Sequence, residues 1–80
     1  MDVHSIYDNN AETLDRYTVF TNEHEGPYRE ALCLSDNPAH PLGFSQFSYG
    51  TPGPHLGDKI TFSDLPLNVQ EHIRARLSLI

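Results

Sequence analysis

Positive charge, cysteine and tryptophan are scarce in this chain of 80 residues, which has five Lys and Arg, one Cys and no Trp. Eleven Asp and Glu leave a formal net charge of −6 with His neutral. So few scattered cations cannot neutralise a run of phosphates, and direct nucleic-acid binding is therefore disfavoured. A single cysteine cannot form an internal disulfide, which argues against a stapled secreted scaffold and favours a reducing compartment such as the cytoplasm.

Long apolar runs are also missing. No stretch approaches the roughly 20 apolar residues of a membrane-spanning helix. Residues 1–4 lack the basic region that precedes the apolar core of a signal peptide. We therefore expect neither a membrane segment nor a signal peptide. The length predicts one domain over residues 1–80, since two halves would each bury too little apolar surface.

The negative charge is concentrated in the first part of the chain. Residues 1–36 hold eight acidic and two basic side chains, whereas acids and bases balance over residues 37–80. One explanation is an ordinary solvated surface, because acidic side chains keep small proteins soluble. The other is a negatively charged face directed at a basic partner. The candidate partner-binding residues are Asp8, Glu12, Asp15, Glu23, Glu25, Glu30 and Asp36.

Short strands are predicted over most of the chain. We expect strands at residues 3–7, 13–21, 28–34, 44–49 and 59–62, separated by loops at 22–27, 35–43 and 50–57. Residues 13–21 (TLDRYTVFT) give the strongest signal because they are rich in β-branched and aromatic side chains. Apolar bulk falls on both faces of this segment, which predicts a central strand that is covered on at least part of each side.

A helix is predicted at the C-terminal end. Ser63, Asp64 and Pro66 are typical of a helix start, where side-chain oxygens accept from free N–H groups and proline fits the first turn. The apolar stripe that follows consists of Val69, Ile73, Leu77 and Ile80. The predicted fold is α+β, a small antiparallel sheet of three to five strands packed against one C-terminal helix.

Metal-binding patterns are absent from the sequence. The five histidines lie at least 15 residues apart, without the close His or Cys spacings of zinc sites. Residues 8–12 begin like a calcium loop, but Thr13 stands where glycine is needed and Val19 where a bidentate glutamate is needed. We expect no metal and no cofactor.

Catalytic patterns are equally weak. Cys33 lies in an apolar run, where a small buried side chain is the simpler role, and the spacing of Gly50, Gly53 and Gly57 fits no nucleotide-binding loop. We expect a non-enzymatic protein. A small metal-dependent or cysteine-dependent enzyme is the weaker alternative.

Several segments together resemble a family of short, uncharacterised phage and prophage proteins. These segments are Ser5-Ile6-Tyr7-Asp8-Asn9, Asp15-Arg16-Tyr17-Thr18-Val19, Ser35-Asp36-Asn37-Pro38, Gly43-Phe44-Ser45-Gln46, His55-Leu56-Gly57 and residues 60–66. The chain has Asn10 where the family has glycine. A second resemblance, in size, acidity and source, is to anti-CRISPR proteins, including inhibitors of type I-C systems.

The resemblance and the acidic charge together suggest a function. We expect an inhibitor that binds the CRISPR interference (Cascade) complex of the host through an acidic surface and blocks target DNA, acting as a monomer in the host cytoplasm. Carboxylates at alternate strand positions lie roughly 6.6 Å apart and can occupy a cationic channel meant for phosphates. The hypothesis requires that these acids gather and that Arg16 and Arg29 do not neutralise them. The alternative is a phage accessory or regulatory interaction module without DNA mimicry.

Overall fold

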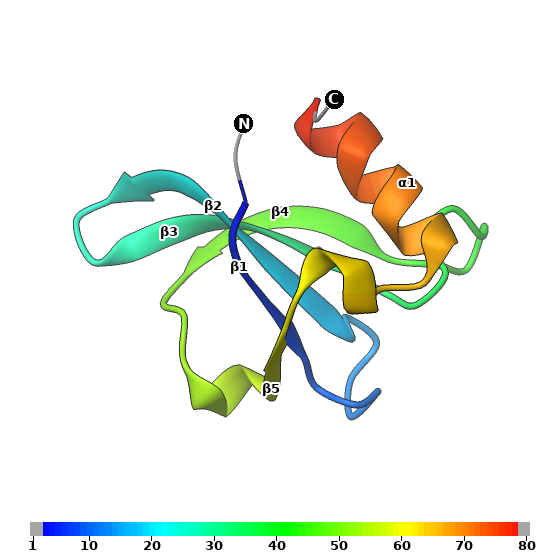
Figure 1. Ribbon diagram of the computed structural model, residues 1–80, viewed down its shortest axis with the longest axis horizontal. Coiled ribbons are helices and arrows are strands. Elements are labelled where there is room, and N and C mark those ends of the chain that lie inside the picture. The colour runs from blue at the N-terminus through cyan, green and yellow to red at the C-terminus, as the bar shows by residue number, and fades with distance from the viewer. Residues whose placement is uncertain (1–2, 79–80) are drawn as a thin grey trace.

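The computed structural model describes residues 3–78, which form one five-stranded antiparallel sheet with an α-helix on one face (Figure 1). The strands are β1 (Val3–Asp8), β2 (Tyr17–Glu25), β3 (Tyr28–Leu34), β4 (Ser45–Gly50) and β5 (Asp58–Ile60), and the helix is α1 (Leu67–Leu77). Short 3-10 turns occur at Pro54–Leu56 and Phe62–Asp64. The predicted small α+β fold is confirmed.

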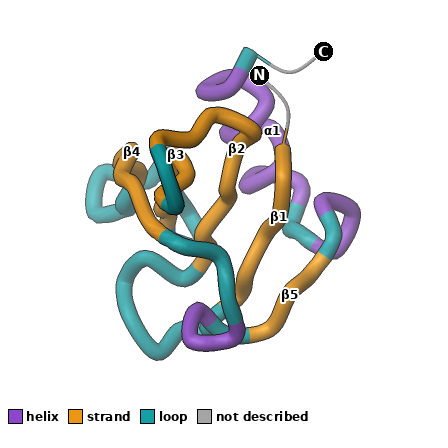
Figure 2. The backbone as a smooth tube through the Cα atoms, turned by 90° about the vertical axis from the view of Figure 1, so that its left-hand side faces the viewer, coloured by secondary structure: helices purple, strands orange, loops and turns teal. Residues whose placement is uncertain are grey.

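Strand order in the sheet is β4-β3-β2-β1-β5, so β2 is central and β4 and β5 form the outer edges (Figure 2). β2 contributes to two apolar clusters, as its composition predicted. On one face, Tyr17 and Val19 pack against α1 together with residues of the neighbouring strands. On the other face, Phe20 packs with Tyr7 and Ala31, and the rings of Tyr7 and Phe20 meet edge to face with centroids 6.0 Å apart.

The helix follows its predicted apolar stripe. Val69, Ile73 and Leu77 are all buried, whereas Ile80 lies outside the described residues. The predicted start is corrected in detail, because Thr61 and Asp64 form a capping box around the 3-10 turn and α1 begins at Leu67. In that box the Thr61 N–H donates to the Asp64 carboxylate at 2.9 Å, so the acid caps the preceding turn rather than α1.

The N-terminal limit of β2 differs from its prediction. Residues 13–16 belong to a loop, and the strand begins at Tyr17. The Asn9 side chain holds this loop by donating to Thr13 Oγ1 at 2.7 Å and to the Asp15 carbonyl at 3.2 Å. These bonds outweigh the β-propensity of the segment, because intrinsic strand preference is weak compared with tertiary contacts.

The β2–β3 hairpin is longer than predicted. β2 continues to Glu25, so the expected loop at 22–27 shrinks to Gly26 and Pro27. Gly26 has a φ of 61°, a left-handed angle that suits a two-residue hairpin loop. A bulge between Phe20 and His24 shifts the register of β2 against β3. Smaller corrections move the fourth strand to Ser45–Gly50 and the fifth to Asp58–Ile60.

Candidate functional site

The seven candidate acids lie in two groups near opposite ends of β2. Four surround the N-terminal end of the strand, in the loop at 9–16 or beside the ends of β1 and β3, and they are Asp8, Glu12, Asp15 and Asp36. Three lie on the β2–β3 hairpin, and they are Glu23, Glu25 and Glu30. A strand rises about 3.3 Å per residue, so Glu23 and Glu25 lie roughly 20–26 Å along β2 from Tyr17. Glu30 is nearer, about 13 Å along β3 from Leu34, which pairs with Tyr17. The structure therefore contains no single ladder of all seven carboxylates.

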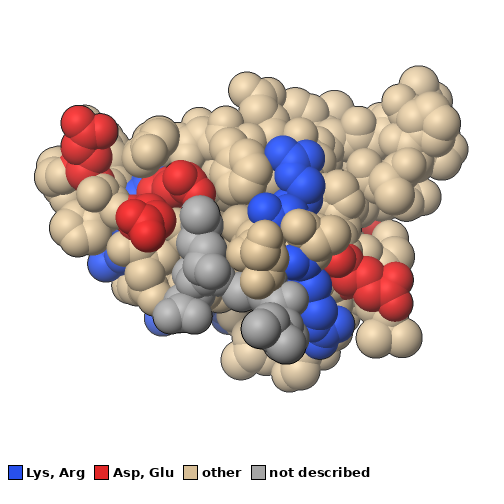
Figure 3. Space-filling model, turned by 90° about the horizontal axis from the view of Figure 1, so that it is seen from above, with Lys and Arg blue, Asp and Glu red and all other residues tan. Residues whose placement is uncertain are grey.

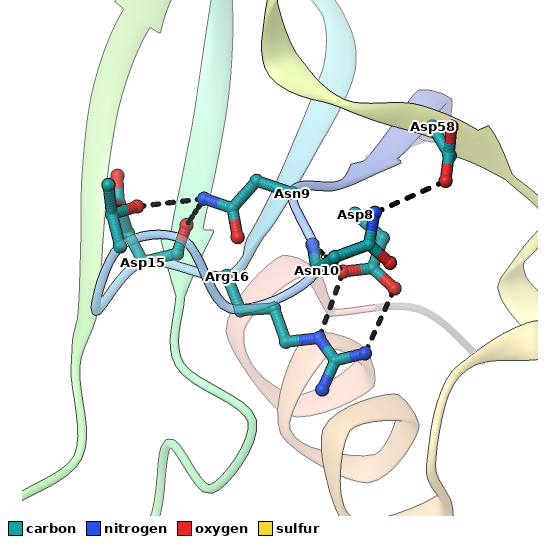
Figure 4. A network of polar contacts seen from close by, with 7 residues as sticks. Asp8, Asn9, Asn10, Asp15, Arg16 and Asp58 are labelled. Atoms are coloured by element: carbon teal, nitrogen blue, oxygen red, sulfur yellow. Dashed lines mark hydrogen bonds and ion pairs between the residues drawn. The ribbon is translucent and has the colours of Figure 1, made fainter.

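Asp8, the first member of the loop group, is neutralised within the protein. The Arg16 guanidinium donates to both carboxylate oxygens of Asp8, at 2.9 and 3.1 Å (Figure 4). These hydrogen bonds lower the pKa of Asp8 and raise the pKa of Arg16. A bidentate pair of this kind stabilises the loop but leaves little charge for a partner.

The other polar groups of this loop also bond one another. The Asn10 N–H donates to Asp8 Oδ1 at 2.8 Å, and its side chain donates to Asp58 at 3.3 Å (Figure 4). The Thr13 hydroxyl donates to the Asp15 carboxylate. Asn10 has a φ of 60°, a left-handed angle that asparagine tolerates better than most residues. The loop at 9–16 is therefore a structural network, although Glu12 is exposed and the buried Asn9 Oδ1 has no hydrogen-bond partner among residues 3–78.

The hairpin acids keep their charge available. Among residues 3–78 the only ion pair is Arg16–Asp8, so Glu23, Glu25 and Glu30 have no cationic partner there. Arg29 is adjacent to Glu30 in the chain, but its side chain donates to the Thr21 carbonyl at 3.4 Å. In Figure 3 acidic surface occurs toward both ends of the molecule, and the acidic surface at one of these ends adjoins the main basic surface.

Exposed aromatic side chains accompany the hairpin acids. Tyr28 is 55% exposed and Tyr49 is 58% exposed. The strand register pairs Glu25 with Tyr28 and Glu30 with Tyr49, so the carboxylates and rings share one face. The sequence alone does not show which tyrosines lie at the surface, because nothing local indicates that β4 is an edge strand.

A hollow of about 430 Å³ lies at this point, and its lining residues are Glu25, Gly26, Pro27, Tyr28 and Tyr49. We call Glu23, Glu25, Tyr28, Glu30 and Tyr49 the hairpin surface. It combines unpaired negative charge with exposed aromatic area, two features that suit contact with a basic protein surface.

Side chains that could bind a metal or act as a nucleophile do not form a site of their own among residues 3–78. Within residues 3–78, no three His, Cys, Asp or Glu side chains are arranged to hold a metal ion. Burial raises the pKa of the Cys33 thiol, which packs beside the Phe20 cluster, so the reactive thiolate is disfavoured. His72 Nε2 lies 2.8 Å from Ser45 Oγ, where its ring links α1 to β4.

Comparisons with protein-family models, with curated proteins and with solved structures found no match. Within residues 3–78, no helix combines the length and the apolar character needed to cross a membrane. The hairpin surface is therefore defined by its own geometry and charge.

Proposed function

We propose that this protein is a non-enzymatic interaction module that docks through the hairpin surface onto a basic, DNA-binding surface of a partner protein. In the setting implied by its resemblance to anti-CRISPR proteins, the partner is the CRISPR interference complex of the host. Docking then prevents that complex from binding its target DNA. The protein would act in the host cytoplasm as a monomer, without contacting nucleic acid itself.

One observation carries this proposal. Glu23, Glu25 and Glu30 lie together on one hairpin without an ion pair to any residue between 3 and 78. A DNA-binding channel attracts phosphates mainly through lysine and arginine, and carboxylates compete for the same cations. The number of acids that make this contact is smaller than the sequence suggested, since the loop group lies at the far end of β2.

The hairpin is also well ordered for docking. β3 pairs with β2 on one side and with β4 on the other, so the backbone at Glu30 has a strand on each side. Glu25 lies opposite Tyr28 at the end of the hairpin, where it is held by the β2–β3 pairing. A preordered surface loses little conformational entropy on binding, so more of the electrostatic attraction contributes to affinity. Steering by opposite charge also raises the association rate.

A charge-reversal experiment tests the proposal. The variant Glu23→Lys/Glu25→Lys/Glu30→Lys is compared with Glu12→Lys/Asp36→Lys/Glu71→Lys, which has the same net charge and changes three exposed acids outside the hairpin. We expect the first variant to lose capture of a purified interference complex and competition with its target DNA, and the second to retain both. Equal behaviour of the two variants would contradict the proposal.

A second candidate function is an accessory interaction module without DNA mimicry. The observation that favours it is the pairing of Asp8 with Arg16, which removes one predicted acid from any mimic, together with the exposed rings of Tyr28 and Tyr49. Binding through those rings would survive the reversal of the hairpin charges. The charge-reversal experiment therefore separates the two functions.

A further inference from the structure

We infer that the hollow at the hairpin takes an arginine side chain of the partner, whose guanidinium stacks on Tyr28 and Tyr49 and pairs with Glu25. This inference rests on the proposed function, because it names the chemical group by which a basic partner is held. It adds a specificity that charge alone does not provide.

The register of three strands creates the arrangement. Glu25 on β2 lies opposite Tyr28 on β3, and Glu30 on β3 lies opposite Tyr49 on β4. Tyr28 and Glu30 alternate along β3, so all four side chains project from the same face. Tyr28 and Tyr49 are therefore diagonal neighbours, at a spacing of about 7–8 Å that lets aromatic side chains reach the same ligand.

The lining of the hollow fits a cation with a flat surface. Tyr28 and Tyr49 supply aromatic rings, and Glu25 supplies a carboxylate to the same hollow. Electrostatic complementarity thus selects a positively charged occupant, while the rings supply apolar contact area. Arginine suits both features, because its planar guanidinium stacks on aromatic faces and forms bidentate bonds with carboxylates.

The same fold already uses this contact next to the hollow. Arg76 of α1 lies over the ring of Phe47, with its guanidinium carbon 5.1 Å from the ring centroid. Phe47 precedes Tyr49 by two positions on β4, so both rings project from the same face of the sheet. The cation–ring contacts among residues 3–78 involve Tyr17, Phe47 and Phe62, and none involves Tyr28 or Tyr49.

Lysine is expected to bind this hollow more weakly than arginine. Its ammonium is a compact, strongly hydrated charge that does not stack and does not form the paired bonds of a guanidinium. An exposed cation–ring contact changes affinity by about two- to fivefold. A purely electrostatic surface would instead bind both side chains about equally.

The test compares two short probes on the isotopically labelled protein by NMR titration at low salt. The probes are the capped peptides Gly-Gly-Arg-Gly-Gly and Gly-Gly-Lys-Gly-Gly. We expect the arginine peptide to bind about two- to fivefold more tightly, with shift changes at residues 25–30 and 47–50. Equal affinities, shift changes elsewhere or no binding at all would overturn the inference.

Substitutions of Tyr49 test whether its ring stacks on the arginine side chain of the peptide. Tyr49→Ala should lower the affinity for the arginine peptide to that for the lysine peptide, whereas Tyr49→Phe should retain the preference because it keeps the ring. Leu42→Ala is the matched control, since Leu42 is 82% exposed and lies outside the hairpin. Retained preference in Tyr49→Ala would contradict a stacking contact.

The failure of this inference is distinguishable from failure of the proposed function. In one outcome both peptides bind equally, while replacing Glu23, Glu25 and Glu30 by lysine abolishes capture of the complex. The acidic docking surface is then supported, and the arginine site is wrong. If that reversal leaves capture unchanged, the proposed function is wrong, whatever the preference for arginine.

Discussion

Arg76 on α1 and Phe47 on β4 form a contact that joins the helix to an edge of the sheet. The guanidinium carbon lies 5.1 Å from the ring centroid, and Arg76 Nη1 lies 3.4 Å from Ser45 Oγ on the same strand. His72, one turn earlier on the helix, also contacts Ser45, at 2.8 Å. Two helical side chains thus hold β4, the strand that carries Tyr49 of the hairpin surface.

Replacing Arg76 should weaken this attachment. We expect Arg76→Gln to lower the free energy of unfolding by about 0.5–1 kcal/mol, the size of an exposed cation–ring contact. Urea denaturation followed by circular dichroism measures the change. Glu71→Gln on the same helix is the control, because Glu71 is exposed and has no contact of this kind. Equal stability of the two variants would show that the contact adds nothing.

The stability of the protein should be sensitive to a small reduction in the size of a buried side chain on α1. Ile73 is fully buried between α1 and the sheet, so Ile73→Val should lower the free energy of unfolding by about 0.5–1.5 kcal/mol. Leu67→Ala is the control, because Leu67 is 73% exposed and its truncation should change stability by less than about 0.5 kcal/mol. A larger loss in the control than in Ile73→Val would contradict the packing described above.

The Asp8–Arg16 pair should make stability depend on pH in the acidic range. Hydrogen bonding from Arg16 lowers the pKa of Asp8 in the folded protein. The pair therefore stabilises fully above the unfolded pKa of about 3.9, and this contribution is lost as the pH falls through the folded pKa. Denaturation curves between neutral and strongly acidic pH should show a smaller acid-dependent loss for Asp8→Asn than for the wild type. Identical losses would exclude this pair as a cause of the pH dependence.

Gly57 should be intolerant of a side chain. Its φ is 106°, and a Cβ there would collide with the backbone oxygen of Asp8. We expect Gly57→Ala to destabilise the protein by about 1–3 kcal/mol. Gly50→Ala is the control, since the nearest atom to its Cβ would be Phe20 Cε1 at 3.8 Å. The difference in melting temperature between the two variants checks this prediction, and similar values would contradict it.

Binding to a basic partner should depend on salt. Screening shortens the Debye length from about 10 Å at 0.1 M salt to about 3 Å at 1 M. We expect the affinity for a purified interference complex to fall steeply over this range, because the carboxylates of Glu23 and Glu25 are exposed. Affinity that is independent of salt would favour the accessory module, which binds through aromatic contacts.

Local sequence patterns were sufficient for some elements. Residues 28–34 form β3 with the predicted bounds, and Val69, Ile73 and Leu77 are buried as their helical spacing indicated. The start of β2 was wrong because the Asn9 side chain bonds to Thr13 and Asp15 and holds them in a loop. Such a bond depends on the path of the chain, which residue types alone do not reveal.

In the candidate site, too, some features could be predicted from the sequence and others depend on tertiary contacts. The sequence located the excess of acids, but charge counting does not show which carboxylates already have partners. In the structure Asp8 pairs with Arg16. The Arg29 side chain donates to the Thr21 carbonyl and forms no ion pair with Glu30. Glu23, Glu25 and Glu30 thereby remain available on the hairpin.

By itself the amino-acid sequence determined the α+β class, the apolar stripe of the helix and the central strand, because each depends on a periodicity among near neighbours. Only the tertiary structure decided that Glu25, Tyr28, Glu30 and Tyr49 meet on one face. That meeting depends on the register of three strands and on β4 lying at an edge, and register is a property of paired strands that no single segment contains.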